Sequence, residues 1–180
     1  MLIDRCLRIS VKETIKSLFE GPPTESGLSA FNVYSETDMR DMNKGKLMPE
    51  APYIFITDSR IAPTTAQLPF IAIDATPSKE PFELGNEQGR RIAVDLHIFG
   101  KSRGERDDLA SFIADYLKTI TIENHNSSGS YLGYAAGATM CVGEIVSDAK
   151  MSYMDISEEE SLEGSLENWT ILNFEFLSKY

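Results

Sequence analysis

Residues 90–100, which read RRIAVDLHIFG, are the part of the chain that decides the fold. Isoleucine, valine and leucine fill every second position of residues 92–98, and alanine, aspartate and histidine lie between them. An alternation of period two predicts a β-strand with one apolar face and one mixed face. Such a strand is typical of a sheet that is covered on one side.

A turn and an amphipathic helix are predicted directly after this strand. Gly100 to Gly104 turns the chain, and Ser102 stands three residues before Glu105, the spacing of a helix capping box. The helix that follows has one apolar stripe, formed by Leu109, Phe112, Ile113, Tyr116 and Leu117. The sequence therefore predicts a strand-turn-helix unit over residues 90–118.

A second amphipathic helix is predicted over residues 3–19, where Ile3, Leu7, Val11, Ile15 and Leu18 recur every three or four positions. Two prolines after Gly21 end it, because proline cannot continue the helical hydrogen bonds. Strands are predicted at 30–35, 53–57, 69–73, 139–146 and 169–177. The strand at 69–73 is expected at a sheet edge because Pro69 opens it.

The remaining stretches are predicted as loops: residues 36–50, 58–68, 76–89, the glycine-rich 123–138 and the acidic 155–167. Each helix has one apolar stripe and each good strand one apolar face, so the economical packing is two layers. We therefore expect a single α+β domain over residues 1–180, with two helices packed on one face of a mainly antiparallel sheet, plus long loops.

Composition narrows the class of function. The 180 residues carry 17 basic and 28 acidic side chains, for a net charge of −11, which argues against nucleic acid or an anionic membrane as the main partner. No apolar run reaches the roughly 18 residues of a membrane span. Two distant cysteines, Cys6 and Cys141, favour a reducing compartment such as the cytoplasm.

Candidate chemistry is sparse in this sequence. Gly100-Lys101-Ser102 resembles the end of a phosphate-binding loop, but that pattern requires a glycine where Asp95 stands. Asp95 and His97 share one strand face and could form an oriented general base, or His97 could be solvated or face another subunit. The histidines and cysteines lack zinc-ligand spacing. We expect no catalytic, cofactor or metal site, and no enzyme.

The sequence indicates a surface for contact with partners more clearly than it indicates a catalytic site. The loop at 36–50 carries Met39, Met42, Leu47 and Met48, and methionine suits adaptable contact surfaces. These four residues form a candidate assembly-contact loop; the alternative is that they pack against their own domain.

The order of elements resembles the tail terminator proteins of long-tailed bacteriophages and their relatives among minor tail and neck proteins. The resemblance lies in an N-terminal amphipathic helix, a short strand ending near Val33-Tyr34, a proline-led strand at 52–56, the strand-turn-helix unit and a closing strand at 169–176. Extra length falls near residues 36–50, 58–90 and 123–168.

The resemblance implies a virion structural protein that is assembled in the host cytoplasm. Six copies would form a ring on the head-proximal end of the tail tube, end its polymerisation and join it to the neck or head connector. DNA would pass through without specific binding, along an acidic lumen or rim that includes Glu158, Glu159 and Glu160. Another neck, head-completion or baseplate ring protein is an alternative, as is a small-ligand-binding domain or a hydrolase using Asp95 and His97.

Overall fold

The computed structural model describes residues 2–21, 30–58, 63, 67–84, 87–117, 119–125, 131–141 and 168–179. Its helices are α1 (Leu2–Glu20), α2 (Glu36–Asn43) and α3 (Arg103–Tyr116). Its strands are β1 (Asn32–Tyr34), β2 (Tyr53–Thr57), β3 (Phe70–Leu84), β4 (Glu87–Phe99), β5 (Thr119–His125), β6 (Tyr131–Cys141) and β7 (Trp169–Lys179).

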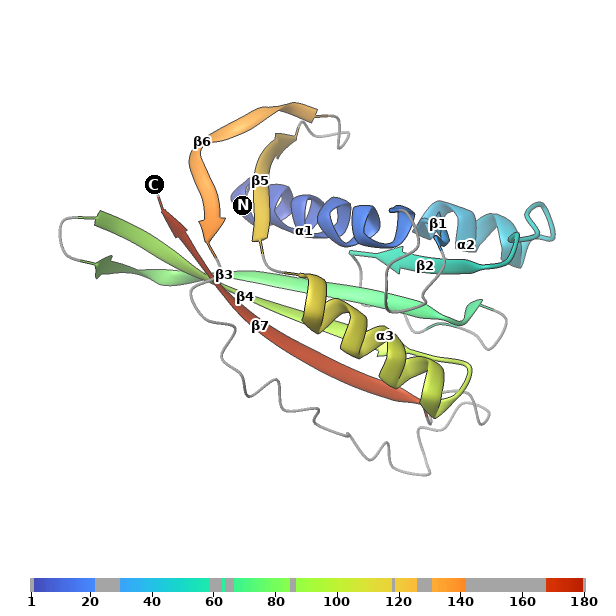
Figure 1. The fold of residues 1–180 in the computed structure, drawn as a ribbon. Coiled ribbons are helices and arrows are strands. Elements are labelled where there is room, and N and C mark those ends of the chain that lie inside the picture. The colour runs from blue at the N-terminus through green and yellow to red at the C-terminus, as the bar shows by residue number, and fades with distance from the viewer. Residues whose placement is uncertain are drawn as a thin grey trace.

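The described strands form one sheet in the order β1-β2-β3-β4-β7-β6-β5. The first two pairings, β1 with β2 and β2 with β3, are parallel, and the others are antiparallel. The strands β1, β2, β3, β4 and β7 make the main sheet. The β5–β6 hairpin continues it through two residue pairs between β6 and β7 (Figure 1). The expectation of a mixed helix-and-sheet fold with a mainly antiparallel sheet is confirmed.

One face of the main sheet carries the larger apolar cluster. Its rows run across the strands, for example Ile71 beside Ile98 and Leu96 beside Leu172. The two long helices contribute to the same cluster through Leu7, Val11, Ile15 and Phe19 of α1 and Leu109, Ala110, Phe112 and Ile113 of α3. Most residues of the two predicted stripes therefore belong to this cluster or pack against it. Tyr116 is an exception, at 41% exposed, and the side chain of Ile3 lies outside the described ones.

The other face carries a second, smaller cluster. It is built from Phe55, Leu68, Phe70, Ala72 and Phe99, with Met39 of α2 packed among them. Apolar side chains thus lie on both faces of the sheet. On the mixed face of β4, Phe99 joins Phe55 and Phe70 in the smaller cluster.

Helix α2 corrects the expectation of a loop over residues 36–50. Ser35 stands at its N-cap in extended conformation, and the Asp38 carboxylate accepts hydrogen bonds from the Ser35 backbone N–H at 2.6 Å and from its hydroxyl at 2.7 Å. The charged composition concealed a helix whose apolar side is only Met39 and Met42.

The placement of β3 at an edge was also wrong, since β3 lies between β2 and β4. Pro69 precedes the first residue of the strand, where a missing N–H removes no ladder hydrogen bond. The Pro69 carbonyl even accepts a hydrogen bond from the Phe55 N–H at 3.1 Å.

Two predicted loops are in fact paired strands. Residues 76–84 and 87–89 continue β3 and β4, which pair from Thr76 opposite Ala93 to Leu84 opposite Glu87, with a register shift between Pro77 and Pro81. Much of 123–138 lies in β5 and β6, and Gly133 has a positive φ of 132° there. Strands pair through backbone hydrogen bonds and need no apolar side chains, so the polar composition of these two stretches wrongly predicted loops. Residues 142–146 and 155–167 lie outside the described part of the chain.

The turn between β4 and α3 depends on a glycine. A Cβ atom on Gly100 would lie 2.6 Å from the Arg106 nitrogen and 2.8 Å from the Ser102 oxygen. The Ser102 hydroxyl accepts a hydrogen bond from the Glu105 N–H at 3.2 Å, as the predicted cap requires. The Glu105 carboxylate accepts one from the Lys101 N–H at 2.6 Å.

We therefore predict that Gly100→Ala lowers the free energy of unfolding by about 1–3 kcal/mol, because the new methyl group meets backbone that cannot move aside. Gly104→Ala is the matched control. Its Cβ would meet only the Ser102 hydroxyl at 4.0 Å, and alanine favours the helix by up to about 1 kcal/mol. Urea denaturation of both variants measures this; equal stability of the two would contradict it.

Candidate functional site

A row of aromatic side chains crosses the main sheet from edge to edge. Tyr34, Phe55, Phe70, Phe99 and Trp169 are successive register partners on β1, β2, β3, β4 and β7. The ring centroids of Phe99 and Trp169 lie 5.4 Å apart with the planes 6° from parallel, and those of Phe70 and Phe99 are 5.8 Å apart. Aromatic pairs at such distances add to the stability that burial provides.

His97 lies beside this row. Its ring stacks on Trp169, with centroids 5.5 Å apart and planes at 23°. Asp95, two residues earlier on the same face, is the register partner of Asp74 on one side and Asn173 on the other. Glu175 is the register partner of Ala93, one row further.

The structure thus places the predicted acid–base pair on one face, as the alternation indicates, with both side chains half-buried. The stacking against Trp169 gives the imidazole a packing role. Within the described residues, no group of three or more histidine, cysteine, aspartate or glutamate side chains could hold a metal ion.

The four residues of the candidate assembly-contact loop have different surroundings. Met39 is buried and Met42 packs against the same cluster, so both serve their own domain. Leu47 is half-buried, whereas Met48 is 88% exposed. Of the four, Met48 is the side chain most available to a partner. Glu158, Glu159 and Glu160 lie outside the described residues.

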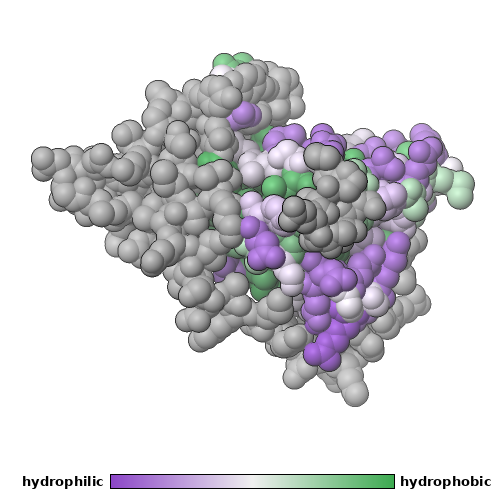
Figure 2. Space-filling view, viewed as in Figure 1, coloured by the Kyte–Doolittle hydropathy of each residue, from purple (hydrophilic) through white to green (hydrophobic). Residues whose placement is uncertain are grey.

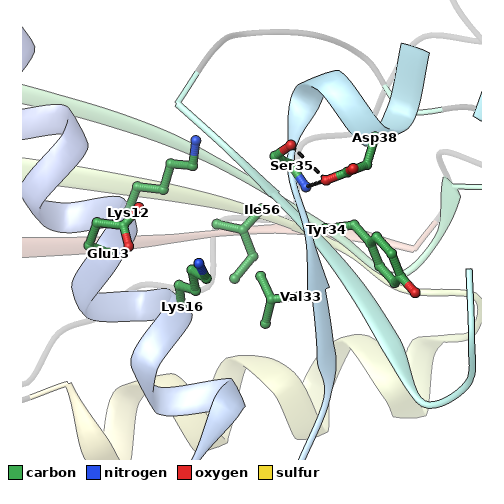
Figure 3. Close-up of a pocket in the computed structure, with 8 residues that line it drawn as sticks. All are labelled: Lys12, Glu13, Lys16, Val33, Tyr34, Ser35, Asp38 and Ile56. Carbon is green, nitrogen blue, oxygen red and sulfur yellow. Dashed lines mark hydrogen bonds between the residues drawn. The ribbon is translucent and has the colours of Figure 1, made fainter. Parts of the chain in front are cut away.

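A hollow of about 230 Å³ lies where α1, β1 and α2 meet (Figure 3). It is lined by Lys12, Glu13 and Lys16 of α1, Val33, Tyr34 and Ser35 at β1, Asp38 of α2 and Ile56 of β2. In Figure 3, Val33 and Ile56 stand between α1 and the start of α2. The hollow therefore combines an apolar floor with a rim of both charges, and we call it the α1–β1 hollow.

The charged residues of the α1–β1 hollow differ in what they already bind. Asp38 is held by the N-cap of α2. The Lys16 ammonium lies 3.7 Å from the Glu20 carboxylate, with both side chains well exposed, so this pair is weak. No local sequence pattern indicates the hollow, since its lining comes from three separate stretches of the chain, 12–16, 33–38 and residue 56.

A buried hydroxyl on α1 helps to hold the β5–β6 hairpin against that helix. Ser10 is 2% exposed; its hydroxyl accepts a hydrogen bond from the Glu123 N–H at 2.9 Å and donates to the Cys6 carbonyl at 2.7 Å. Beyond this contact the hairpin carries Leu132, which is 66% exposed. In the view of Figure 2, the described surface over α3 is largely hydrophilic.

Comparison with known proteins adds no assignment. No protein-family model matches the chain, and no curated protein is significantly similar to it in sequence. Of the helices in the described ranges, none combines the length and the apolar character that crossing a bilayer requires.

We predict that Ser10→Ala lowers the free energy of unfolding by about 1 kcal/mol, because the part-buried Glu123 N–H loses the Ser10 hydroxyl as its acceptor. Hydrogen exchange of the Glu123 amide should accelerate in the same variant. Ser17→Ala is the control: Ser17 is exposed and bonds only within its own helix, to the Thr14 carbonyl at 2.7 Å. If both variants leave that amide equally protected, Ser10 does not hold the hairpin.

Proposed function

We propose that this chain is a virion structural protein of a long-tailed bacteriophage, a tail terminator. Copies form a ring, of six subunits by analogy with that family, on the head-proximal end of the tail tube. The ring ends tube polymerisation and joins the tail to the neck or head connector. In this proposal α1 and α3 lie together on one face of the sheet, and α2 packs against the smaller cluster on the other face.

The observation that carries this proposal is the strand-turn-helix unit closed by the last strand. β4 runs through the Gly100 turn into α3, and β7 pairs with β4 from Gly89 opposite Lys179 to Phe99 opposite Trp169. The shared cluster of α1, α3 and the isoleucine-rich sheet face supports the two-layer arrangement. This is an analogy at the level of the fold, and a fold by itself does not define a function.

A ring of this kind works through shape and charge. A head-to-tail interface closes on itself and leaves two unlike faces, so that one can cap the tube and the other can meet the neck. Met48, exposed on the loop between α2 and β2, is a candidate for the contact with the tube or the neck. With a net charge of −11, a lumen that includes Glu158, Glu159 and Glu160 repels DNA phosphates and lets DNA slide.

We predict that the purified protein forms rings of about six times the 20.1 kDa chain mass, alone or once isolated tail tubes are supplied. Multi-angle light scattering measures the mass, and negative-stain microscopy shows the position on the tube. A stable dimer that forms no ring when tail tubes are present would contradict the proposal. Density at the baseplate end would instead favour the alternative of a baseplate ring protein.

The hydrolase or ligand-binding alternative rests on Asp95 and His97 sharing one face. It predicts a concavity beside them, whereas the α1–β1 hollow is lined by other elements. We expect His97→Ala to form rings and to support phage infectivity as the unaltered protein does. Lost infectivity with intact rings would favour the alternative; His97→Phe, which keeps a flat ring beside Trp169, controls for the loss of stacking.

A further inference from the structure

We propose that copies of this chain join through two unlike surfaces, with the loop that carries Met48 in one copy seated on the exposed side of α3 in the next. This inference rests on the ring of the proposed function, and it assigns Met48 to the neighbouring subunit rather than to the tube or the neck. Met48 and Tyr116 are two of the three large apolar side chains that are exposed in the described part of the chain, and Leu132 is the third.

The loop between α2 and β2 presents Met48 on an ordered backbone. It leaves α2 through a Schellman motif, in which the N–H groups of Gly45 and Lys46 donate to carbonyls of the helix at 2.9 and 2.8 Å. The φ of Gly45 is 69°, as that motif requires. On the other side of Met48, the Glu50 N–H donates to the Tyr34 hydroxyl at 3.1 Å. A loop that is already ordered loses little conformational entropy when it binds.

The charge of this loop is positive, in contrast to that of the whole chain. Lys44 and Lys46 are exposed, and neither forms an ion pair with another described residue. Two lysines and one glutamate, Glu50, leave residues 44–50 with a net charge of +1. Because the chain as a whole carries −11, the surface of a second copy offers the complementary charge.

The exposed side of α3 supplies that negative charge. Asp108 and Asp115 are exposed, and a spacing of seven residues, about two turns, places them on one side of the helix. Neither carboxylate is paired with a described basic residue. The two arginines of the helix, Arg103 and Arg106, both lie within ion-pair distance of Asp107. The acids on the exposed side therefore keep their charge for a partner.

Tyr116 supplies the apolar part of the same surface. It follows Asp115 at the end of α3, is 41% exposed and has its ring centroid 4.9 Å from that of Phe112. A methionine sulfur makes favourable contacts with aromatic rings. Seating Met48 beside Tyr116 removes apolar surface of both copies from water, with lysines of one copy facing aspartates of the other.

The two surfaces lie on different sides of one molecule, so a contact between them joins separate copies. α2 packs against the smaller apolar cluster on one face of the sheet, whereas α3 belongs to the larger cluster on the other face. Figure 1 shows the end of α2 away from α3. A contact between unlike surfaces is heterologous, and its repetition in one sense gives a ring when the rotation closes.

Charge reversal tests the contact, with sedimentation velocity over a concentration series as the measurement. The loop variant carries Lys44→Glu and Lys46→Glu, and the helix variant carries Asp108→Lys and Asp115→Lys. We expect each to weaken self-association about 10- to 100-fold, because like charges then face each other. The combined variant, in which the charges are exchanged, should associate within about 10-fold of the unaltered protein. Combined charges that restore nothing would overturn the contact.

A matched control separates this contact from a general effect of net charge. Glu13→Lys with Glu20→Lys changes the net charge as much as the helix variant does, at two exposed acids of α1. This control should associate at least as well as the unaltered protein, and a loss equal to that of the helix variant would overturn the contact. Restored association in the combined variant cannot arise from misfolding, so the reversal experiment is decisive even where one variant is less stable.

The apolar part of the contact has its own test in the same measurement. We expect Met48→Ser to weaken self-association about 10-fold, as the loss of one buried apolar side chain implies. Leu132→Ser is the control, since it removes another exposed apolar side chain that lies on neither surface. Equal association of these two variants would overturn the role of Met48.

This contact and the tail-terminator proposal fail in different ways. Rings on tail tubes that survive both charge reversals overturn the contact and leave the terminator standing. Association that the combined variant restores, without rings on the supplied tubes, supports the contact and overturns the terminator. Protein that stays a single chain at every concentration and on tail tubes overturns both.

Discussion

The register of β4 between β3 and β7 is the constraint on which the rest of the structure depends. β4 pairs with β7 over eleven consecutive positions and with β3 over a similar length. Because side chains alternate between faces, a shift of one residue would exchange the two faces of every paired strand. The observed register puts Ile98, Leu96 and Val94 in the larger apolar cluster and aligns Phe99 with Phe70 and Trp169 on the opposite face.

Helix α1 connects this core to the β5–β6 hairpin and to the α1–β1 hollow. Its helical spacing directs Leu7, Val11 and Ile15 into the core, Ser10 to the hairpin and Lys12 and Lys16 to the hollow. One helix thereby contributes to the core, to the hairpin contact and to the lining of the hollow.

The elements with strong periodicity could be predicted from the sequence, and those set by tertiary contacts could not. The alternation in 92–98 and the stripes of the helices at 3–19 and 107–117 indicate β4, α1 and α3 correctly. The sequence analysis missed α2 because only Met39 and Met42 form its apolar side. It also missed the paired parts of β3 and β4 within residues 76–89, because prolines and charged residues there do not show the alternation of a strand. The α1–β1 hollow needs three separate segments brought together, which no local pattern indicates. The acid–base pair was located correctly, yet its stacking on Trp169 required the register.

The central claim is that this polypeptide acts as a repeated unit that closes a cylinder and leaves bound molecules chemically unchanged. An electron cryomicroscopy reconstruction of the protein on its tail tubes tests that claim most directly. The account predicts a closed ring at the head-proximal end. Single chains that enclose a small ligand beside Asp95 and His97 would contradict it.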